Sequence, residues 1–255
     1  MSTTTLAGSS PPLCKWLAIG LPLGLMALLL LDPSQLDFAI SDLFYRPGSG
    51  FIGKHSFFLE VILHDRAKQV VILLAGLALV GLLLSCVYRP WAAWRRPLSM
   101  LALALALCGA IVSPVKNLTG VHCPWDLTQY GGQETYTPLL GERAPAIKPG
   151  RCWPGGHATS GFALFALYFA LRDRKPRLAR SMLWLALGLG VVFSLGRTMQ
   201  GAHFLSHNLW TAVFDWLICL TCYRLILYRP LRPALQPALA SAPPAIESSR
   251  QEIQR

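Results

Sequence analysis

The chain has 255 residues, of which 53% are hydrophobic and 14% are charged. About a quarter of the residues of an average soluble protein are charged, so this composition excludes an ordinary soluble globular domain. The formal net charge of +11 could indicate a nucleic-acid partner, but many basic residues cluster in short stretches between hydrophobic segments. We therefore expect no nucleic-acid partner and assign the charge to membrane topology.

The apolar residues form long runs rather than recurring at helical spacing, which favours membrane-spanning helices. A helix needs about 20 apolar residues to cross the hydrocarbon core, and six stretches approach that length. They cover about 13–31, 69–88, 98–115, 157–171, 180–195 and 207–228. The first stretch has one basic residue near its start, Lys15, and no clear small-residue cleavage site, so we interpret it as an uncleaved span.

These stretches predict an all-α fold, a bundle of six transmembrane helices formed by residues 1–232. Residues 233–255 are rich in Ala, Pro, Ser and Gln, a composition typical of a disordered tail. The sequence shows no internal repeat and no second domain, and no pattern in it indicates an oligomeric state.

Basic residues concentrate between the second and third spans, between the fourth and fifth, and at the end of the sixth and just beyond it. They are Arg89, Arg95, Arg96, Arg172, Arg174, Lys175, Arg177, Arg180, Arg224, Arg229 and Arg232. The positive-inside rule puts these short regions in the cytoplasm. Both termini then face the cytoplasm, and the loops over about 32–68, 116–156 and 196–206 face outward. We expect a multi-pass protein of the inner (plasma) membrane of a bacterium, with these loops on the periplasmic or extracytoplasmic side.

Several polar residues fall at the outward ends of the predicted spans. His157 follows a Pro-Gly-Gly run, Arg197 precedes His203 by an x5 spacing, and Lys116 ends the third span. An Arg at the centre of a membrane helix costs roughly 2.5–3.5 kcal/mol, so such residues usually line a polar cavity. Alone, Lys116 could be a snorkelling residue and His157 a helix cap. Together, the four predict a phosphate site at the outer face.

These segments resemble the three motifs of the type 2 phosphatidic acid phosphatase (PAP2) superfamily, which are Lys-x6-Arg-Pro, Pro-Ser-Gly-His and Ser-Arg-x5-His-x3-Asp. The matching segments are residues 116–124, 154–157 and 196–207, in the same order. Each motif alone is weak, but order, spacing and the six-span layout together are specific. The resemblance implies a membrane phosphatase that hydrolyses a lipid phosphate or diphosphate, among membrane lipids, without a cofactor or a metal.

The resemblance also implies a role for each matched residue. His203 attacks phosphorus and becomes a phosphohistidine, and His157 protonates the leaving alcohol and later helps water attack. Positive side chains and backbone N–H groups at a helix start would stabilise the phosphate charge. The residues matched to phosphate binding are Lys116, Arg197, Gly155 and Gly156.

The two serines and the first-motif arginine of the family pattern are replaced in this chain. Gly155 and Gly196 replace serines, which removes two hydroxyl groups but leaves the backbone N–H groups. Cys123 replaces the arginine of the first motif. Arg151 or Arg143, in the same outward loop, could supply that cation instead, and we favour Arg151 because it lies close to the second motif.

His207 replaces the aspartate that orients the nucleophile in the family. A neutral His207 can still accept a hydrogen bond and fix the tautomer of His203, but it offers no negative charge. Asp126, in the outward loop, could supply a carboxylate instead. His207 is therefore a possible orienter, and it could equally be a structural hydrogen bonder.

Cys123 and Cys152 are the two of the seven cysteines that fall in an outward loop. An oxidising outer compartment favours a disulfide between them. The bond would join the first motif to the second and would contribute roughly 3–4 kcal/mol in the chain-entropy model. A metal site built from these cysteines, His122 and His157 is the alternative, but it lacks a compact Cys-x2-Cys spacing.

Two other functions stay open beside the hydrolase. A phosphohistidine could pass its phosphoryl group to an alcohol, which would make the protein a phosphotransferase. A catalytically inactive relative could instead bind or move a phospholipid; the replaced arginine and aspartate favour this reading, whereas the two histidines oppose it. By resemblance, the substrate could be undecaprenyl diphosphate, phosphatidic acid, phosphatidylglycerol phosphate or a lipid A phosphate.

Overall fold

The computed structural model describes residues 12–143 and 149–228, and these residues belong to one compact helical unit. The predicted disordered tail, 233–255, lies outside the described residues. The helices are α1 (Pro12–Leu30), α2 (Ser34–Asp42), α3 (Ala67–Val87), α4 (Arg95–Thr119), α5 (Thr159–Phe162), α6 (Phe165–Leu171), α7 (Pro176–Met199) and α8 (Leu205–Ile226). The two short strands β1 (Tyr45–Arg46) and β2 (Gly50–Phe51) form an antiparallel hairpin.

Shorter helical turns complete the described chain. A π-helix over Phe58–Arg66 leads into α3, and a 3₁₀ turn over Arg89–Trp94 leads into α4. Two more 3₁₀ turns, Pro124–Asp126 and Thr128–Tyr130, lie in the long loop after α4. Gly120 ends α4 in the left-handed conformation (φ 63°), which glycine adopts without steric cost.

Four helical stretches of the described chain are long and apolar enough to cross a membrane, namely Ala67–Val87, Arg89–Thr119, Pro176–Met199 and Leu205–Ile226. The predicted first span corresponds to a bent pair, in which α1 and α2 meet at 85°, and it makes a fifth candidate if the pair counts as one crossing. The predicted fourth span is a shorter apolar stretch over Thr159–Leu171. The described residues thus support four or five spans rather than the expected six.

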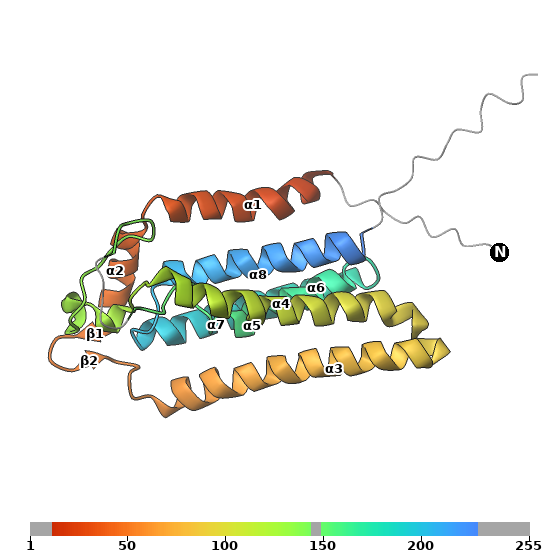
Figure 1. Ribbon diagram of the computed structural model, residues 1–255, viewed down its shortest axis with the longest axis horizontal. Coiled ribbons are helices and arrows are strands. Elements are labelled where there is room, and N and C mark those ends of the chain that lie inside the picture. The colour runs from red at the N-terminus through yellow and green to blue at the C-terminus, as the bar shows by residue number, and fades with distance from the viewer. Residues whose placement is uncertain (1–11, 144–148, 229–255) are drawn as a thin grey trace, which may run out of the picture. The chain divides into compact units, whose positions relative to one another are not determined.

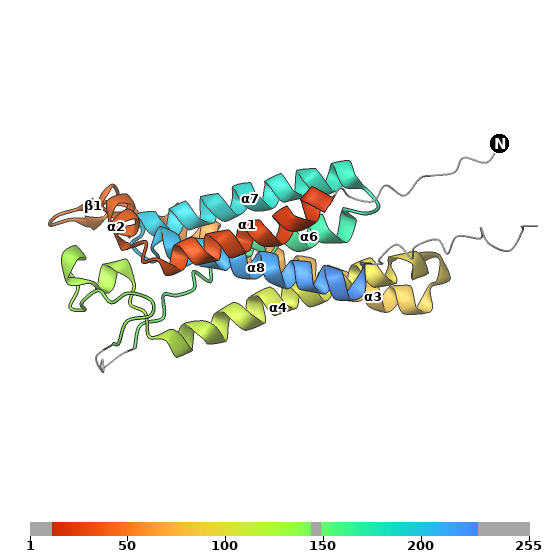
Figure 2. The same cartoon turned by 90° about the horizontal axis from the view of Figure 1, so that it is seen from above.

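The fourth stretch is short because it lies inside the bundle. Ala158, Ala163 and Phe169 are fully buried, and α5 and α6 pack against α4, α7 and α8. A side chain at Gly161 would collide with the backbone of Gly190 on α7, so these two helices touch through bare glycines. Figures 1 and 2 show α8 between α1 and α4, with α3 packed against α4.

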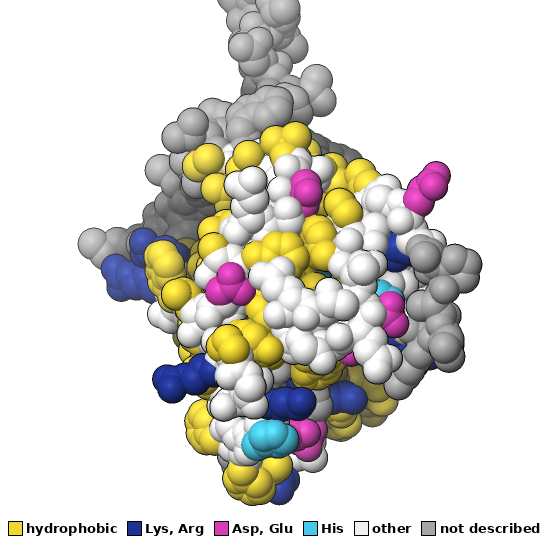
Figure 3. All heavy atoms as spheres, turned by 90° about the vertical axis from the view of Figure 1, so that its left-hand side faces the viewer, with side chains coloured by type: hydrophobic (Ala, Val, Ile, Leu, Met, Phe, Trp, Pro, Cys, Tyr) yellow, Lys and Arg dark blue, Asp and Glu magenta, His cyan; other side chains and the backbone are white. Residues whose placement is uncertain are grey.

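One end of the bundle gathers the loops that carry the motifs. The α2 helix, the β1–β2 hairpin, the long loop after α4 and the α7–α8 connection meet there (Figure 1). An aromatic cluster joins them, formed by Phe38, Phe44, Tyr45, Phe51, Tyr130, Tyr136 and Phe204. Asp37 of α2 fixes the start of α8, because it accepts a hydrogen bond from Ser206 N (2.8 Å) and another from Ser206 Oγ. Seen from this end, basic and acidic side chains lie among apolar ones (Figure 3).

Candidate active site

Two histidines that are 46 residues apart in the chain meet at the loop end of the bundle. His157 lies in the turn before α5, and His203 lies in the connection between α7 and α8. His157 Nδ1 is 3.4 Å from His203 Nε2, and the ring centroids are 5.7 Å apart. His203 is only 2% exposed, whereas His157 is partly exposed. The structure therefore brings together the two histidines that the sequence predicts to be catalytic.

The surroundings of His203 define which ring nitrogen carries hydrogen. His203 Nδ1 lies 2.9 Å from the carbonyl oxygen of Cys152. A carbonyl oxygen only accepts, so Nδ1 donates and Nε2 keeps its lone pair. Burial, with the positive charge of Lys116 next in importance, lowers the pKa of His203 well below its usual value. The ring is therefore neutral near pH 7 and presents an unprotonated Nε2 toward His157.

Two cations of the predicted site lie at helix ends beside these histidines. Arg197, in the last turn of α7, donates from Nη1 to Gln200 Oε1 (2.8 Å), and its guanidinium carbon lies 6.0 Å from the ring centroid of Trp125. Arg197 Nε is buried and has no hydrogen-bond partner within the described chain. Lys116, in the last turn of α4, lies over Gly156, where an added Cβ would be 3.0 Å from Lys116 Nζ.

Close contacts account for the glycines at positions 155 and 156 of the second motif. Gly156 lies against Lys116, and Gly155 lies against Asn208. Gly155 N donates to the carbonyl of His207 (2.9 Å), so this N–H is already used. A Cβ at Gly155 would collide with Asn208 Oδ1, which is why a serine does not fit there without rearrangement. Of the two glycines predicted to bind phosphate, Gly155 has its N–H occupied, whereas Gly156 lies beside the ammonium group of Lys116.

A disulfide joins Cys123 and Cys152, whose Cα atoms are 5.1 Å apart. Cys152 N also donates to the carbonyl of Val121 (2.9 Å), which ties the segment before the second motif to the segment after α4. Cys123 thus occupies the position of the first-motif arginine as half of a crosslink. The crosslink holds the carbonyl group that receives the hydrogen bond of His203.

His207 lies close to His203 but is not hydrogen-bonded to it. The two ring centroids are 6.2 Å apart, and His207 Nδ1 is buried without a hydrogen-bond partner in the described chain. The nitrogen that His207 was expected to hold, Nδ1 of His203, donates to Cys152 instead. A backbone carbonyl therefore does what an aspartate or His207 was expected to do.

The other expected replacements lie elsewhere in the long loop. Asp126 Oδ2 accepts a hydrogen bond from Cys123 N (3.1 Å) and so stabilises its own turn. Arg151 is exposed at the surface. Arg143 donates to the carbonyls of Pro138 (2.9 Å), Leu139 (3.1 Å) and Gly141 (3.3 Å), and it lines a pocket together with His207. Arg143, unlike Arg151, therefore lines a pocket with a residue of the third motif.

Three features of this site were missed by reasoning from sequence. The Cys152 carbonyl could not be found, because a backbone acceptor leaves no mark in a side-chain motif. Trp125 could be found only through the fold. Gln200 follows Arg197 by three residues, a spacing that places two side chains on one helix face, so its contact with Arg197 had a signal in the sequence.

Comparison with known proteins agrees with this geometry. The chain matches the family model of the PAP2 superfamily over residues 97–231, which is more than half of its length and includes all three motif segments. Searches of curated proteins and of solved structures gave no significant match. PAP2 proteins are generally phosphatases that act on phosphate esters. The match confirms the resemblance drawn from the motifs, and the chain belongs to the PAP2 superfamily.

Proposed function

We propose that this protein is an integral-membrane phosphatase that hydrolyses a lipid phosphate or diphosphate through a phosphohistidine. The observation that carries the proposal is the state of His203: a neutral ring, with Nδ1–H donated to a carbonyl and an unprotonated Nε2 that lies 3.4 Å from His157 Nδ1. Such a nitrogen is a nucleophile that needs no prior deprotonation. Membership of a superfamily of phosphatases supports the same reaction.

In the first step, His203 Nε2 forms a bond to phosphorus and the bond from phosphorus to the leaving oxygen breaks. His157 gives a proton to that oxygen, so the lipid leaves as an alcohol, or as a monophosphate if the substrate is a diphosphate. In the second step, a water molecule loses its proton to His157 and its oxygen attacks the phosphohistidine. The nitrogen–phosphorus bond breaks, phosphate leaves, and both histidines return to their starting states.

Lys116 and Arg197 would stabilise the charge that the phosphoryl oxygens carry during both steps. Arg197 is held in position by Gln200 and Trp125, and its buried Nε has no partner in the described chain, so a phosphate oxygen can accept its hydrogen. Lys116 lies over Gly156, next to the turn that carries His157. The site therefore provides positive charge on two sides of the histidine pair.

The Cys152 carbonyl would keep His203 in the reactive tautomer. During attack the ring of His203 becomes positively charged, and the carbonyl dipole stabilises this charge less than a carboxylate would. We therefore expect a lower turnover than in a relative with an aspartate at this position. Positioning is retained, because the disulfide and the Val121 hydrogen bond fix the carbonyl.

For the membrane arrangement, we propose six crossings, with both termini in the cytoplasm and the site on the periplasmic side. The α1–α2 pair would be the first crossing and the buried Thr159–Leu171 stretch the fourth. Support comes from the opposite end of the bundle, where Arg174 donates to the Ala93 carbonyl (2.8 Å) and lies 5.2 Å from the Trp94 ring. The strongly basic connections thus meet far from the histidines, as the positive-inside rule requires.

The test is phosphate release by the purified protein in detergent, with EDTA present, across a panel of lipid phosphates and diphosphates. We expect release by the wild type and by His55→Ala, which changes an exposed histidine, and none by His203→Ala. An acid-free quench should trap a phosphohistidine in the wild type alone. Release that survives His203→Ala would overturn the mechanism, and folded wild type without release would favour the inactive lipid-binding relative. Transfer to an added acceptor lipid would identify a phosphotransferase.

A further inference from the structure

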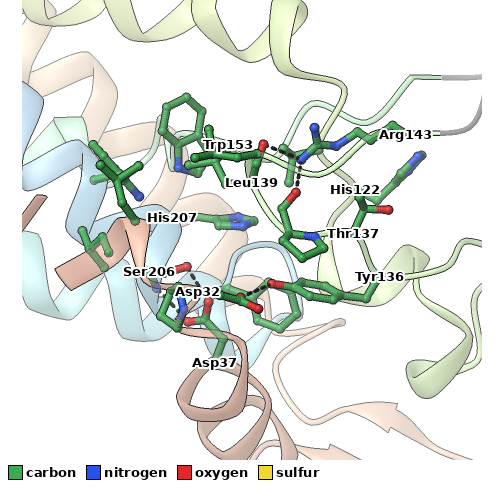
Figure 4. A pocket seen from close by; sticks show the side chains of 18 of the residues that line it. Asp32, Asp37, His122, Tyr136, Thr137, Leu139, Arg143, Trp153, Ser206 and His207 are labelled. Carbon is green, nitrogen blue, oxygen red and sulfur yellow. Dashed lines mark hydrogen bonds between the residues drawn. The ribbon is translucent and has the colours of Figure 1, made fainter. Parts of the chain in front are cut away.

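A cavity lies behind the histidine pair and is lined by His207. It measures about 80 Å³, enough for several water-sized groups, and is bounded by the end of α1, by α2, by the loop after α4 and by the start of α8. His157, His203, Lys116 and Arg197 do not line it, so it is separate from the proposed reaction centre. Figure 4 shows the ring of His207 projecting into it.

One wall of this cavity carries two buried ring nitrogens that lack protein hydrogen-bond partners. His207 is 6% exposed and its Nδ1 has no hydrogen-bond partner in the described chain; the same holds for Nε1 of Trp153. Buried polar groups are normally paired, so two such atoms on one cavity favour a bound group, water or ligand, that completes them. Arg143 adds a positive charge on the same side (Figure 4). An anionic group such as a phosphodiester fits this wall.

The facing wall carries acidic side chains. Asp37 lies buried at the floor and Asp32 lies at the exposed mouth, and neither has an ion-pair partner among the described residues. Tyr136 donates its hydroxyl to Asp32 Oδ1 (3.1 Å). Burial and the nearby charge of Asp32 raise the pKa of Tyr136, which keeps that hydroxyl protonated. A cationic group at this wall would find two carboxylates and the aromatic faces of Tyr136 and Phe204.

The rim of the cavity is apolar and belongs to the membrane helix α1. Leu29 and Leu30, the last two residues of α1, line the cavity together with Leu139 and Leu140 of the long loop. Leu30 is 45% exposed and Leu140 is 78% exposed. A ligand with a polar end in the cavity could therefore lay apolar chains over these leucines.

We propose that this cavity binds the headgroup of a zwitterionic phospholipid, one with a phosphodiester and a primary ammonium group. The phosphodiester lies against Trp153, His207 and Arg143, and the ammonium group lies against Asp32 and Asp37. The acyl chains leave over Leu30 and Leu140. This site is distinct from the proposed catalytic one and does not depend on catalysis by His203.

The test is equilibrium binding of two short-chain lipids to the purified wild-type protein in detergent. We expect dihexanoyl phosphatidylethanolamine to bind about tenfold more tightly than dihexanoyl phosphatidylglycerol, which lacks the ammonium group. Asp32→Asn should abolish this preference and leave the glycerol lipid unaffected. Asparagine retains the acceptor oxygen for Tyr136 and tolerates the left-handed backbone at this position (φ 55°), so only charge is removed.

Arg143→Gln should weaken the binding of both lipids, whereas Arg46→Gln, at an exposed arginine of the β1–β2 hairpin that does not line the cavity, should alter neither. Equal affinities for the two lipids in the wild type, or a preference that survives Asp32→Asn, would overturn the zwitterionic assignment. Absence of saturable binding would overturn the site. Neither result depends on phosphate release, so failure of the proposed phosphatase activity would be seen separately.

Discussion

The start of α8 separates two polar regions with different charge, the histidine pair with Lys116 and Arg197 on one side and the cavity behind His207 on the other. The first region brings cations to the neutral ring of His203, the proposed nucleophile, whose Nδ1 donates to a carbonyl. The second region sets an arginine opposite two aspartates. The difference teaches that neighbouring histidines on one segment can serve different chemistry, because the groups around each ring decide what it can bind.

The largest expected effect is on kcat/KM, and it should differ between substitutions of Arg197 and of Arg143. Arg197→Gln should lower kcat/KM by about 10²–10³-fold, because one donor to the transferring phosphoryl group is lost. Arg143→Gln, across the start of α8, should lower it far less. Steady-state phosphate release measures both. Equal losses in the two variants would show that the regions act as one site.

Removal of the Cys123–Cys152 disulfide should have the next largest effect. It would act on His203, the proposed nucleophile, only through the position of the Cys152 carbonyl. Cys123→Ser with Cys152→Ser should destabilise the fold by roughly 3–4 kcal/mol. We expect its kcat to fall while KM changes little, since Lys116 and Arg197 keep their places. Thermal unfolding and kinetics in detergent measure these effects. Cys86→Ser, at an exposed free cysteine, is the control, and unchanged kcat in the double variant would remove the positioning role of the carbonyl.

A smaller effect, on stability, is expected at Gly155, which packs against Asn208 at the start of α8. Gly155→Ser restores the family residue but brings Cβ against Asn208 Oδ1, and such overpacking costs typically 1–3 kcal/mol. The melting temperature should therefore fall. Adding Asn208→Ala opens the space and should recover part of the loss. If Gly155→Ser is as stable as the wild type, the collision is not what excludes serine.

The smallest effect is a pH dependence of stability caused by His203. In the unfolded chain its imidazole binds a proton as pH falls through about 6.5, whereas the folded ring, with its depressed pKa, stays neutral. Below that pH the unfolded state binds more protons, so stability falls, by at most about 1.4 kcal/mol per pH unit for this group. His203→Gln should flatten the fall in melting temperature between about pH 7 and about pH 5. His55→Gln should follow the wild type, and identical slopes in all three proteins would contradict the buried neutral ring.

Much of the site could be predicted because its parts are side chains in spaced motifs at helix ends. Lys116, His157, Arg197 and His203 meet at one end of the bundle, as positions at the outward ends of spans require. The Cys152 carbonyl could not be predicted from side-chain types. The choice between Arg143 and Arg151 depends on the path of a loop, which sequence spacing does not define.

In the fold, too, the helices that form continuous apolar runs could be predicted, whereas features that depend on packing could not. Continuous apolar runs predicted α3, α4, α7 and α8, with boundaries shifted by a few residues. The bend between α1 and α2 and the short fourth stretch were not foreseen. A bend depends on what α2 packs against, and a stretch buried by protein does not need the length that lipid demands. The cavity behind His207 also escaped prediction, because its walls come from four separate parts of the chain.

The glycine contact between α5 and α7 also bears on the order in which the protein is assembled in the membrane. Thirteen residues of apolar helix, Thr159–Leu171, are too few to cross hydrocarbon alone. Gly161 and Gly190 let this segment sit directly on α7, while α4 and α8 cover its other sides. We therefore expect the segment that carries His157 to find a stable place last during biogenesis, so that the histidine pair forms after the surrounding helices have inserted.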